Sequence, residues 1–309
     1  LLFGDLTAQM ACGKGAAAEL IGLFEKYSRD TMLEAMGELM NRAERQTRQL
    51  IEQIPDGTYR FTDHIDGLGA DPQELVLEAA VTVKGDSVSV DWTGSSDQVE
   101  GGINSPLPFT KACGYTALRS IMPAEVPNCY GYTRAIETIA PEGSIMNPVL
   151  PGPCGARGIT GYRMIDALFG ALAQAVPDRV RADGSGGSTL PTISGWRDGA
   201  PYVFCETFMG NSGGSSTSDG QDGAPHIGAN QCNVPVEMIE SSYPLRIDSY
   251  GLVPDTGGPG MYRGGLSLVR EYRILAETAE LNVRSDKRRR PPHGLFGGKE
   301  GTPSWNIIN

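Results

Sequence analysis

Residues 75–92 read LVLEAAVTVKGDSVSVDW, and their pattern constrains how the segments on both sides can pack. In the second half, Val88, Val90 and Trp92 alternate with polar residues, which is the period of a strand with one buried face. A Lys-Gly-Asp-Ser turn at residues 84–87 separates the two apolar runs. The stretch therefore predicts a β-hairpin.

The segment before the hairpin changes from a helical period to a strand period. Residues 16–27 suggest one helix, and apolar residues at steps of three and four up to residue 54 suggest a second helix. Ser28 is a candidate N-cap for the second helix, and Pro55-Asp56-Gly57 ends it. From Gly57 to Thr93 the period is two, typical of strands.

Two further helices are expected after the hairpin. Residues 109–122 predict a helix that ends at Pro123, and Thr160 is placed to cap a helix over residues 162–176. Apolar residues cover most of the surface of the second of these helices. We therefore expect that helix to be buried.

The C-terminal half is rich in glycine and serine between residues 185 and 228, with strand-like runs at 202–207, 266–275 and 279–283. Together these segments predict an α+β or mixed α/β fold. It comprises a helical N-terminal segment, a β-hairpin, buried helices and a largely β, glycine-rich C-terminal half. The chain can be subdivided into a helix and hairpin part, 1–180, and a glycine-rich β part, 181–309.

Composition excludes several classes of protein. The chain has 309 residues, 39% of them hydrophobic, so it can bury a core. A net charge of −11 argues against binding to nucleic acid or to an anionic membrane. The basic run at residues 284–290 is interpreted as a solvated loop. Six scattered cysteines and no spanning or signal segment favour reduced thiols and a cytoplasmic location.

Glycine-rich segments at residues 210–214 and 184–187 are candidates for a phosphate-binding loop. Such a loop needs a lysine after its last glycine and lies between a strand and a helix. Neither segment has that lysine. We therefore interpret both segments as turns and expect the chain itself not to bind a nucleotide.

Residues 219–240 concentrate the polar side chains that chemistry needs. His226 follows Asp222 and precedes Asn233 and Glu237, and an imidazole near carboxylates can be a general base or a metal ligand. A histidine that only ties a loop is an equally good reading of this spacing. Glu237 and Glu240 would share one face if residues 236–241 are helical, although such pairs more often mark a solvated helix start.

Residues 255–265 contain five glycines, a density that points to close approach of the backbone to another segment or a ligand. Asp255 and Arg263 can pair across this loop. Asn104 and Arg157 lie in two further rigid turns, and Arg157 is able to hold a carboxylate or phosphate.

Several motifs together resemble the B-type subunit of the hydantoinase/5-oxoprolinase family, which also includes the large subunits of ketone carboxylases. The motifs run in order through nearly the whole chain, and they are residues 4–9, 102–106, 139–144, 147–148, 160–163, 219–240, 255–265 and 291–298. The resemblance identifies residues 1–309 as the C-terminal portion of such a subunit. Members of the family carry a longer N-terminal region with two motifs that look metal-binding, so a Zn or Mn ion would have its ligands there. Metal ligands on the present chain are unknown.

The resemblance also implies a reaction. ATP is bound by an A-type partner, which phosphorylates a cyclic amide such as a hydantoin, 5-oxoproline or another lactam, and the B-type subunit hydrolyses the product. One alternative is carboxylation of a ketone, and another is a non-catalytic assembly subunit. In each case we expect a hetero-oligomer. The residues assigned to catalysis are His226, Asp222, Glu237 and Asn233, and those assigned to substrate binding are Asp255, Arg263, Asn104 and Arg157.

Overall fold

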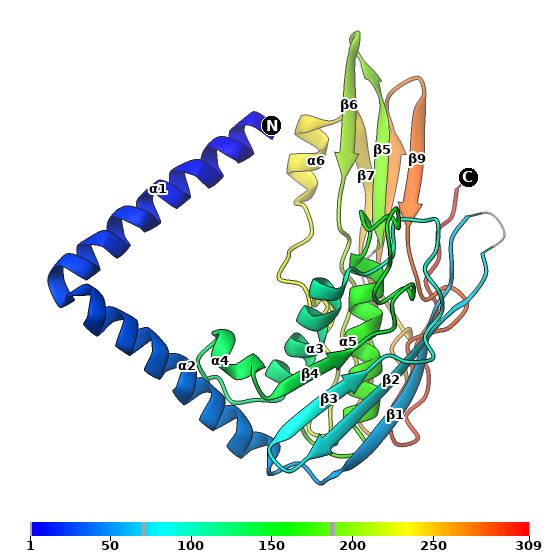
Figure 1. The fold of residues 1–309 in the computed structure, drawn as a ribbon. Coiled ribbons are helices and arrows are strands. Elements are labelled where there is room, and N and C mark those ends of the chain that lie inside the picture. The colour runs from blue at the N-terminus through cyan, green and yellow to red at the C-terminus, as the bar shows by residue number, and fades with distance from the viewer. Residues whose placement is uncertain (1, 70–71, 186–188, 309) are drawn as a thin grey trace.

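The computed structural model of the chain describes residues 2–69, 72–185 and 189–308. Its architecture is mixed α+β, as the sequence predicts, with one four-stranded sheet, one three-stranded sheet and a two-stranded ribbon (Figure 1). The glycine-rich segment at residues 184–187 lies partly outside the described residues. The subdivision near residue 180 stays a prediction.

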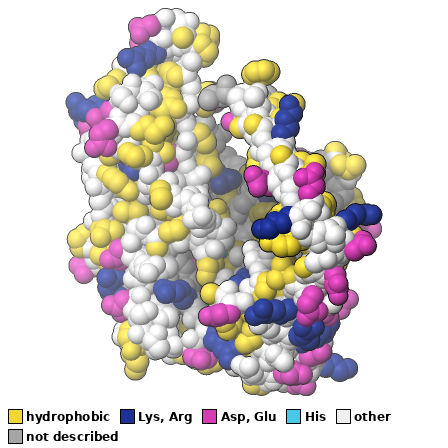
Figure 2. All heavy atoms as spheres, turned by 90° about the vertical axis from the view of Figure 1, so that its left-hand side faces the viewer, with side chains coloured by type: hydrophobic (Ala, Val, Ile, Leu, Met, Phe, Trp, Pro, Cys, Tyr) yellow, Lys and Arg dark blue, Asp and Glu magenta, His cyan; other side chains and the backbone are white. Residues whose placement is uncertain are grey.

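Two long helices form an arm that extends from the body (Figure 1). They are α1 (Leu2–Tyr27) and α2 (Arg29–Ile51), and they meet at Ser28, whose hydroxyl accepts a hydrogen bond from the Thr31 amide at 3.3 Å. The predicted N-cap is thus confirmed. The prediction that the first helix begins at residue 16 is wrong, because the helix begins at Leu2 and continues to residue 16 through three glycines, which are poor helix formers. Figure 2, which faces the side carrying the arm, shows hydrophobic side chains exposed among charged ones.

The first sheet contains the predicted hairpin. Its strands are β1 (Gly57–Ile65), β2 (Leu75–Lys84), β3 (Ser87–Asp91) and β4 (Ile136–Ile139), in that order. Val83 pairs with Val88 across the hairpin, and both side chains are buried. β4 joins parallel to β3 and is not predicted from the sequence, because a four-residue strand gives little periodic signal.

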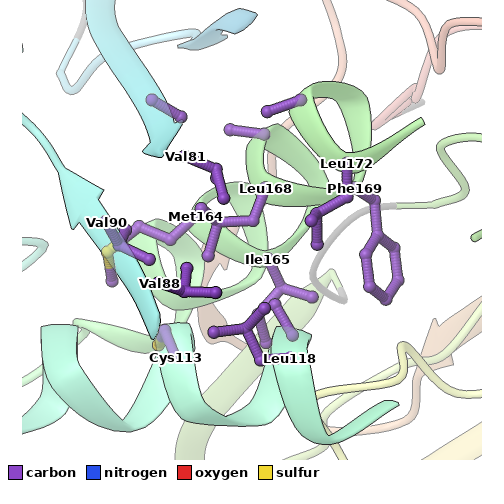
Figure 3. Close-up of a cluster of buried hydrophobic side chains, with 14 of the residues drawn as sticks. Val81, Val88, Val90, Cys113, Leu118, Met164, Ile165, Leu168, Phe169 and Leu172 are labelled. Carbon is purple, nitrogen blue, oxygen red and sulfur yellow. The ribbon is translucent and has the colours of Figure 1, made fainter. Parts of the chain in front are cut away.

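Two helices cover this sheet and complete the main core. α5 (Gly158–Leu172) packs on β1 and β2, with α3 (Leu107–Ser120) on its other side. Figure 3 shows Met164 and Leu168 of α5 against Val81 of β2, all three fully or almost fully buried. The predicted burial of α5 is confirmed. A one-turn helix, α4 (Tyr130–Thr133), lies against α2.

The predicted cap of α5 is wrong. The helix begins at Gly158, so Thr160 lies inside its first turn instead of preceding it. The Thr160 hydroxyl donates to the Ile103 carbonyl at 2.5 Å and ties the helix to the loop before α3. A buried hydroxyl with a long-range acceptor gives no signal in local sequence.

The C-terminal half contains the remaining strands. The three-stranded sheet has the order β6 (Ala200–Cys205), β5 (Leu190–Arg197), β9 (Ala279–Arg284), and the ribbon pairs β7 (Leu245–Val253) with β8 (Ser267–Ile274). The strands expected near 202–207, 266–275 and 279–283 are present, while β5 and β7 are additional to those expected. A second small core joins these strands to α6 (Val236–Ser242), and its buried members are Ile193, Phe204, Ile239 and Leu245.

Candidate functional site: a buried charge network between two histidines

Arg163 is the centre of a buried cluster of charges. It lies on α5, and its side chain is fully buried. Its guanidinium nitrogens lie 3.5 Å from Asp63, 3.4 Å from Asp183 and 3.4 Å from Asp286, and Nη2 also donates to Asp166 one helical turn away. These carboxylates come from β1, α5 and two loops, so a single cation holds four segments together.

Lys287 supplies the second cation of the cluster. Its ammonium contacts the Asp183 carboxylate and lies 3.9 Å from Asp63 Oδ1, and its side chain is only 3% exposed. We call this cluster the Arg163 network. Its members are Asp63, Arg163, Asp166, Asp183, Asp286 and Lys287. Four buried carboxylates therefore face one guanidinium and one ammonium.

The interpretation of the basic run at residues 284–290 as a solvated loop is wrong for its middle. Lys287 is buried because it pairs with Asp183, and Asp286 beside it is also buried. Arg290 at the end of the run remains half exposed and forms a salt bridge to Glu74 at 2.7 Å.

Each end of the network contacts a histidine. His226 Nε2 lies 3.1 Å from Asp166 Oδ1, and the His226 side chain is 8% exposed. His293 Nδ1 lies 3.1 Å from Asp183 Oδ2, and its side chain is 24% exposed. The two imidazoles are thus linked through Asp166, Arg163 and Asp183.

Among the described residues, the two imidazoles differ in how many of their ring nitrogens have a hydrogen-bond partner. His226 Nδ1 accepts a hydrogen bond from the Gly228 amide at 3.0 Å, so its remaining proton sits on Nε2 and is directed to Asp166. Both ring nitrogens are therefore engaged. For His293, Nδ1 faces Asp183, and among the described residues no hydrogen bond occupies Nε2.

The network shifts the pKa values of its members in opposite directions. Burial alone would raise the pKa of Asp183, but Lys287 and Arg163 bring it well below its usual range. Burial alone would lower the pKa of Arg163, but the surrounding carboxylates raise it. Burial raises the pKa of Asp286, because the nearby cation Arg163 offsets only part of the desolvation.

The raised pKa of Asp286 predicts an unusual pH dependence. Its ionised form is costly in the folded state, so this cost is present above its folded pKa and disappears as the pH falls toward the ordinary carboxyl value of about 4. We expect Asp286→Asn, which retains an oxygen for the Asp66 amide, to raise the urea midpoint at pH 8. The gain should shrink as the pH is lowered. The exposed Asp198→Asn is the control, and a lower midpoint for Asp286→Asn at pH 8 would contradict this reading.

Asp222 and Arg263 form a separate surface cluster. Arg263 Nη1 lies 3.1 Å from Asp222 Oδ1, and the same oxygen accepts from the Leu266 amide at 2.6 Å. These contacts lower the pKa of Asp222, first through the Arg263 hydrogen bond. The expected pairing of Arg263 with Asp255 is wrong, because Arg263 turns toward Asp222 and Asp219 while Asp255 is exposed.

The other residues assigned from sequence lie in varied surroundings. Asn233 accepts from the Met209 amide at 2.8 Å, which fixes the approach to α6. Glu237 is exposed on α6, and because α6 is helical the condition for Glu237 and Glu240 to share one face is met. Asn104 is fully buried and donates to three backbone carbonyls, and Arg157 is exposed with its guanidinium 5.2 Å from the Phe109 ring.

These residues therefore do not form one cluster. Among the described residues, no hydrogen bond or salt bridge joins His226 to Asp222, Asn233 or Glu237. What the structure does join to His226 is the Arg163 network, which sequence reasoning missed. The one available signal was the Thr160-Gly161-Tyr162-Arg163 motif, which ends at the central arginine.

Within the described residues, no group of three or more His, Cys, Asp or Glu side chains is arranged to hold a metal ion. The carboxylates of the Arg163 network are occupied by Arg163 and Lys287. The residues of this part of the chain thus do not fit a metal centre. In the same described residues, no helix is long and apolar enough to span a bilayer.

Comparison with known proteins identifies the family. Residues 1–309 match the family described as hydantoinase B/oxoprolinase. The chain belongs to this family.

The chain is 37% identical over 312 residues to a protein of Pseudomonas sp. (strain NS671) named as a putative B-type subunit of a D-/L-hydantoinase, and the match covers 97% of the chain and 52% of that protein. It is 30% identical to the beta subunit of the caprolactamase of Pseudomonas jessenii, covering 96% of the chain and 52% of the relative. The chain thus spans about half the length of these curated relatives.

Solved structures show the same fold. The crystal structure of the ATP-dependent caprolactamase from Pseudomonas jessenii matches with a TM-score of 0.83 at 27% identity, covering 94% of this chain and 51% of that one. A nucleotide-free acetone carboxylase structure matches with a TM-score of 0.75 at 19% identity, covering 85% of this chain and 38% of that one. At that identity the second match shows the fold alone.

Proposed function

We propose that this chain acts within the B-type subunit of an ATP-dependent cyclic amide hydrolase and handles the phosphorylated substrate made with an A-type partner. The main support is the family match over residues 1–309, together with the likeness to the hydantoinase and caprolactamase subunits of the two Pseudomonas relatives. The proposed substrates are a hydantoin, 5-oxoproline or a larger lactam. A hetero-oligomer follows from the subunit names of these relatives.

The chemistry explains why two kinds of subunit would be needed. Resonance makes the carbonyl carbon of a lactam a poor electrophile, and phosphorylation of its oxygen makes it a good one. ATP is proposed to bind mainly to the partner, because neither glycine-rich segment of this chain has the lysine of a phosphate loop. The B-type subunit then has to position water and a base and to exclude bulk solvent.

A divalent metal, Zn or Mn, remains part of the proposal for the complete subunit. Its ligands are assigned to the longer N-terminal region of the family, and the described residues do not fit a metal centre. No step is therefore assigned to a metal on this chain.

The residues assigned from the sequence remain a proposal although this chain does not gather them into one cluster: His226, Asp222, Asn233 and Glu237 for the second step, and Asp255, Arg263, Arg157 and the fully buried Asn104 for substrate binding. The observation that favours His226 is its contact with the Arg163 network through Asp166. Chemistry at His226 requires one of its two hydrogen bonds to open, whereas a role in tying the loop requires both to persist.

His226→Gln separates these two roles. A glutamine amide has a nitrogen that can donate to Asp166 and an oxygen that can accept from the Gly228 amide, so both contacts of the loop tie can persist, but the side chain cannot transfer protons at neutral pH. We expect ATP-coupled ring opening to fall by roughly 10²–10⁴-fold while the melting temperature changes little. His64→Gln, which alters a histidine of β1 outside the network, is the control. Full turnover by His226→Gln would leave His226 with a structural role only.

The alternative in which a ketone is activated and then carboxylated rests on the motif resemblance to the wider family, since the acetone carboxylase match shows the fold alone. The purified complex distinguishes the two through its ATP hydrolysis with hydantoin, 5-oxoproline, a larger lactam, or acetone plus bicarbonate. Stimulation by a lactam supports the amidase. Stimulation by acetone with bicarbonate alone supports the carboxylase, and no coupling with any of them supports a non-catalytic assembly subunit.

A further inference from the structure

Three loops of the C-terminal half, together with residues 177–183, line a cavity of about 360 Å³. They come from residues 211–216, 256–267 and 292–302, and the first two contain or adjoin the glycine-rich segments noted in the sequence. This volume is at the lower end of the range of small-molecule sites. The cavity therefore has room for a small molecule, and an oxyanion of a few heavy atoms would fill only part of it.

The walls of the cavity are built largely from backbone. A Cβ atom on Gly213 would lie 2.1 Å from the Ala182 carbonyl oxygen, and one on Gly258 would lie 2.4 Å from the Lys299 carbonyl oxygen. Only glycine allows the loops to approach this closely. Backbone packed on backbone gives a wall that is preorganised, and it accounts for the density of glycine at residues 255–265.

One wall carries the His293–Asp183 pair. Asp183 is fully buried at its side chain and holds His293 Nδ1 at 3.1 Å, while the Phe61 ring lies 4.9 Å from the imidazole. Arg163 and Lys287 also contact the Asp183 carboxylate and hold it in place. Asp183 and Phe61 thus fix the orientation of the His293 imidazole, and Nε2 is the ring nitrogen left for a ligand.

The charges that line the cavity favour an anion. Asp183 is the only carboxylate among the described lining residues, and it is already contacted by Arg163, Lys287 and His293. Lys299 is the only lysine or arginine of that described lining; its backbone contacts the loop of residues 256–267, and the residue is exposed at the cavity rim. Because Nδ1 faces the Asp183 carboxylate and carries a proton there, Nε2 is a donor only when the ring holds two protons.

We propose that this cavity binds a small oxyanion, either a carboxylate or a phosphate, with the doubly protonated ring of His293 donating from Nε2 and Lys299 adding charge. Hydrolysis of a phosphorylated cyclic amide releases both groups, a carboxylate on the opened ring and inorganic phosphate. The inference goes beyond the proposed function, because the binding site is argued from the cavity and its charges alone.

The test uses the three histidines of the chain as probes. The full chain, labelled with ¹³C at histidine, is titrated with inorganic phosphate and separately with acetate at constant ionic strength, while the three imidazole Cε1–H signals are followed by NMR. We expect one signal to shift saturably with at least one of the two anions, and that signal to be absent in His293→Gln. Saturation by phosphate alone or by acetate alone identifies the source of the oxyanion.

Two lysine variants keep the test informative if His293→Gln fails to fold. Lys299→Gln should weaken binding about tenfold, the worth of one charged hydrogen bond. Lys84→Gln, at the exposed turn of the hairpin, should bind as the unaltered chain does. The proposal is overturned if all three signals drift together without saturation, if the saturable shift persists in His293→Gln, or if Lys299→Gln binds normally. The readout is binding, so failure here leaves the proposed amidase activity untouched.

Discussion

Replacing Arg163 by methionine is expected to lower the free energy of unfolding by about 3–5 kcal/mol, the usual cost of removing one partner from a buried ion cluster. The guanidinium is fully buried and faces four carboxylates from β1, α5 and two loops. Methionine fills similar volume but leaves those carboxylates with Lys287 as the remaining cation of the network. Urea unfolding followed by far-UV circular dichroism measures the change.

The matched control is Arg45→Met on α2. Arg45 forms a salt bridge to Glu38 with both side chains more than half exposed, so its loss should not measurably move the urea midpoint. An Arg163→Met variant as stable as the unaltered chain would show that the network contributes no net stability. The interpretation of Arg163 as the central tie of the fold would then be wrong.

Replacing Glu206 by leucine is expected to have a comparable effect in the second core, again about 3–5 kcal/mol. Glu206 accepts from Arg270 at 2.6 Å, from the Tyr272 hydroxyl at 2.7 Å and from the Val234 amide at 2.7 Å. Leucine would leave the buried Arg270 without its counter-charge and the Val234 amide without its acceptor. The loop leading into α6 should loosen, and amide hydrogen exchange at residues 230–235 reports this directly.

Asp248→Asn serves as the control for Glu206. Asp248 contacts two arginines of the same ribbon, but both are more than half exposed, so this change should leave stability nearly unaltered. Equal losses in the free energy of unfolding of the Glu206 and Asp248 variants would mean that burial does not distinguish these two ion pairs. The argument from the Glu206–Arg270 pair would then fail.

Local sequence patterns predict the regular elements near the hairpin well. Alternation over Val88–Trp92 and the turn before it determine the β2–β3 pairing, and the almost wholly apolar surface of α5 predicts its burial. The same local patterns did not predict β4, β5 or β7. A short strand, or one that exposes alternate residues on a ribbon, carries a weak period, and its partner lies far along the chain.

The candidate site is harder to predict, because its contacts are long-range. Asp63, Arg163, Asp183 and Asp286 are separated by up to 223 residues (286 − 63), and nothing in their local sequence marks them as partners. For Asp255 and Arg263 the error was the opposite one, because residues close together in the sequence were expected to pair and do not. Two residues in one glycine-rich loop looked like a pair, but Arg263 contacts Asp222 from another loop.

The most direct test of the central proposal is the stoichiometry of ring opening against ATP hydrolysis by the complete complex with the proposed A-type partner. The account predicts that one cyclic amide stimulates ATP hydrolysis and that each ATP consumed yields one opened ring. It also predicts that the partner alone hydrolyses ATP without opening the ring. Ring opening by the partner without this chain, or ATP hydrolysis that no cyclic amide stimulates, would contradict the assignment of the chain to the hydrolytic step.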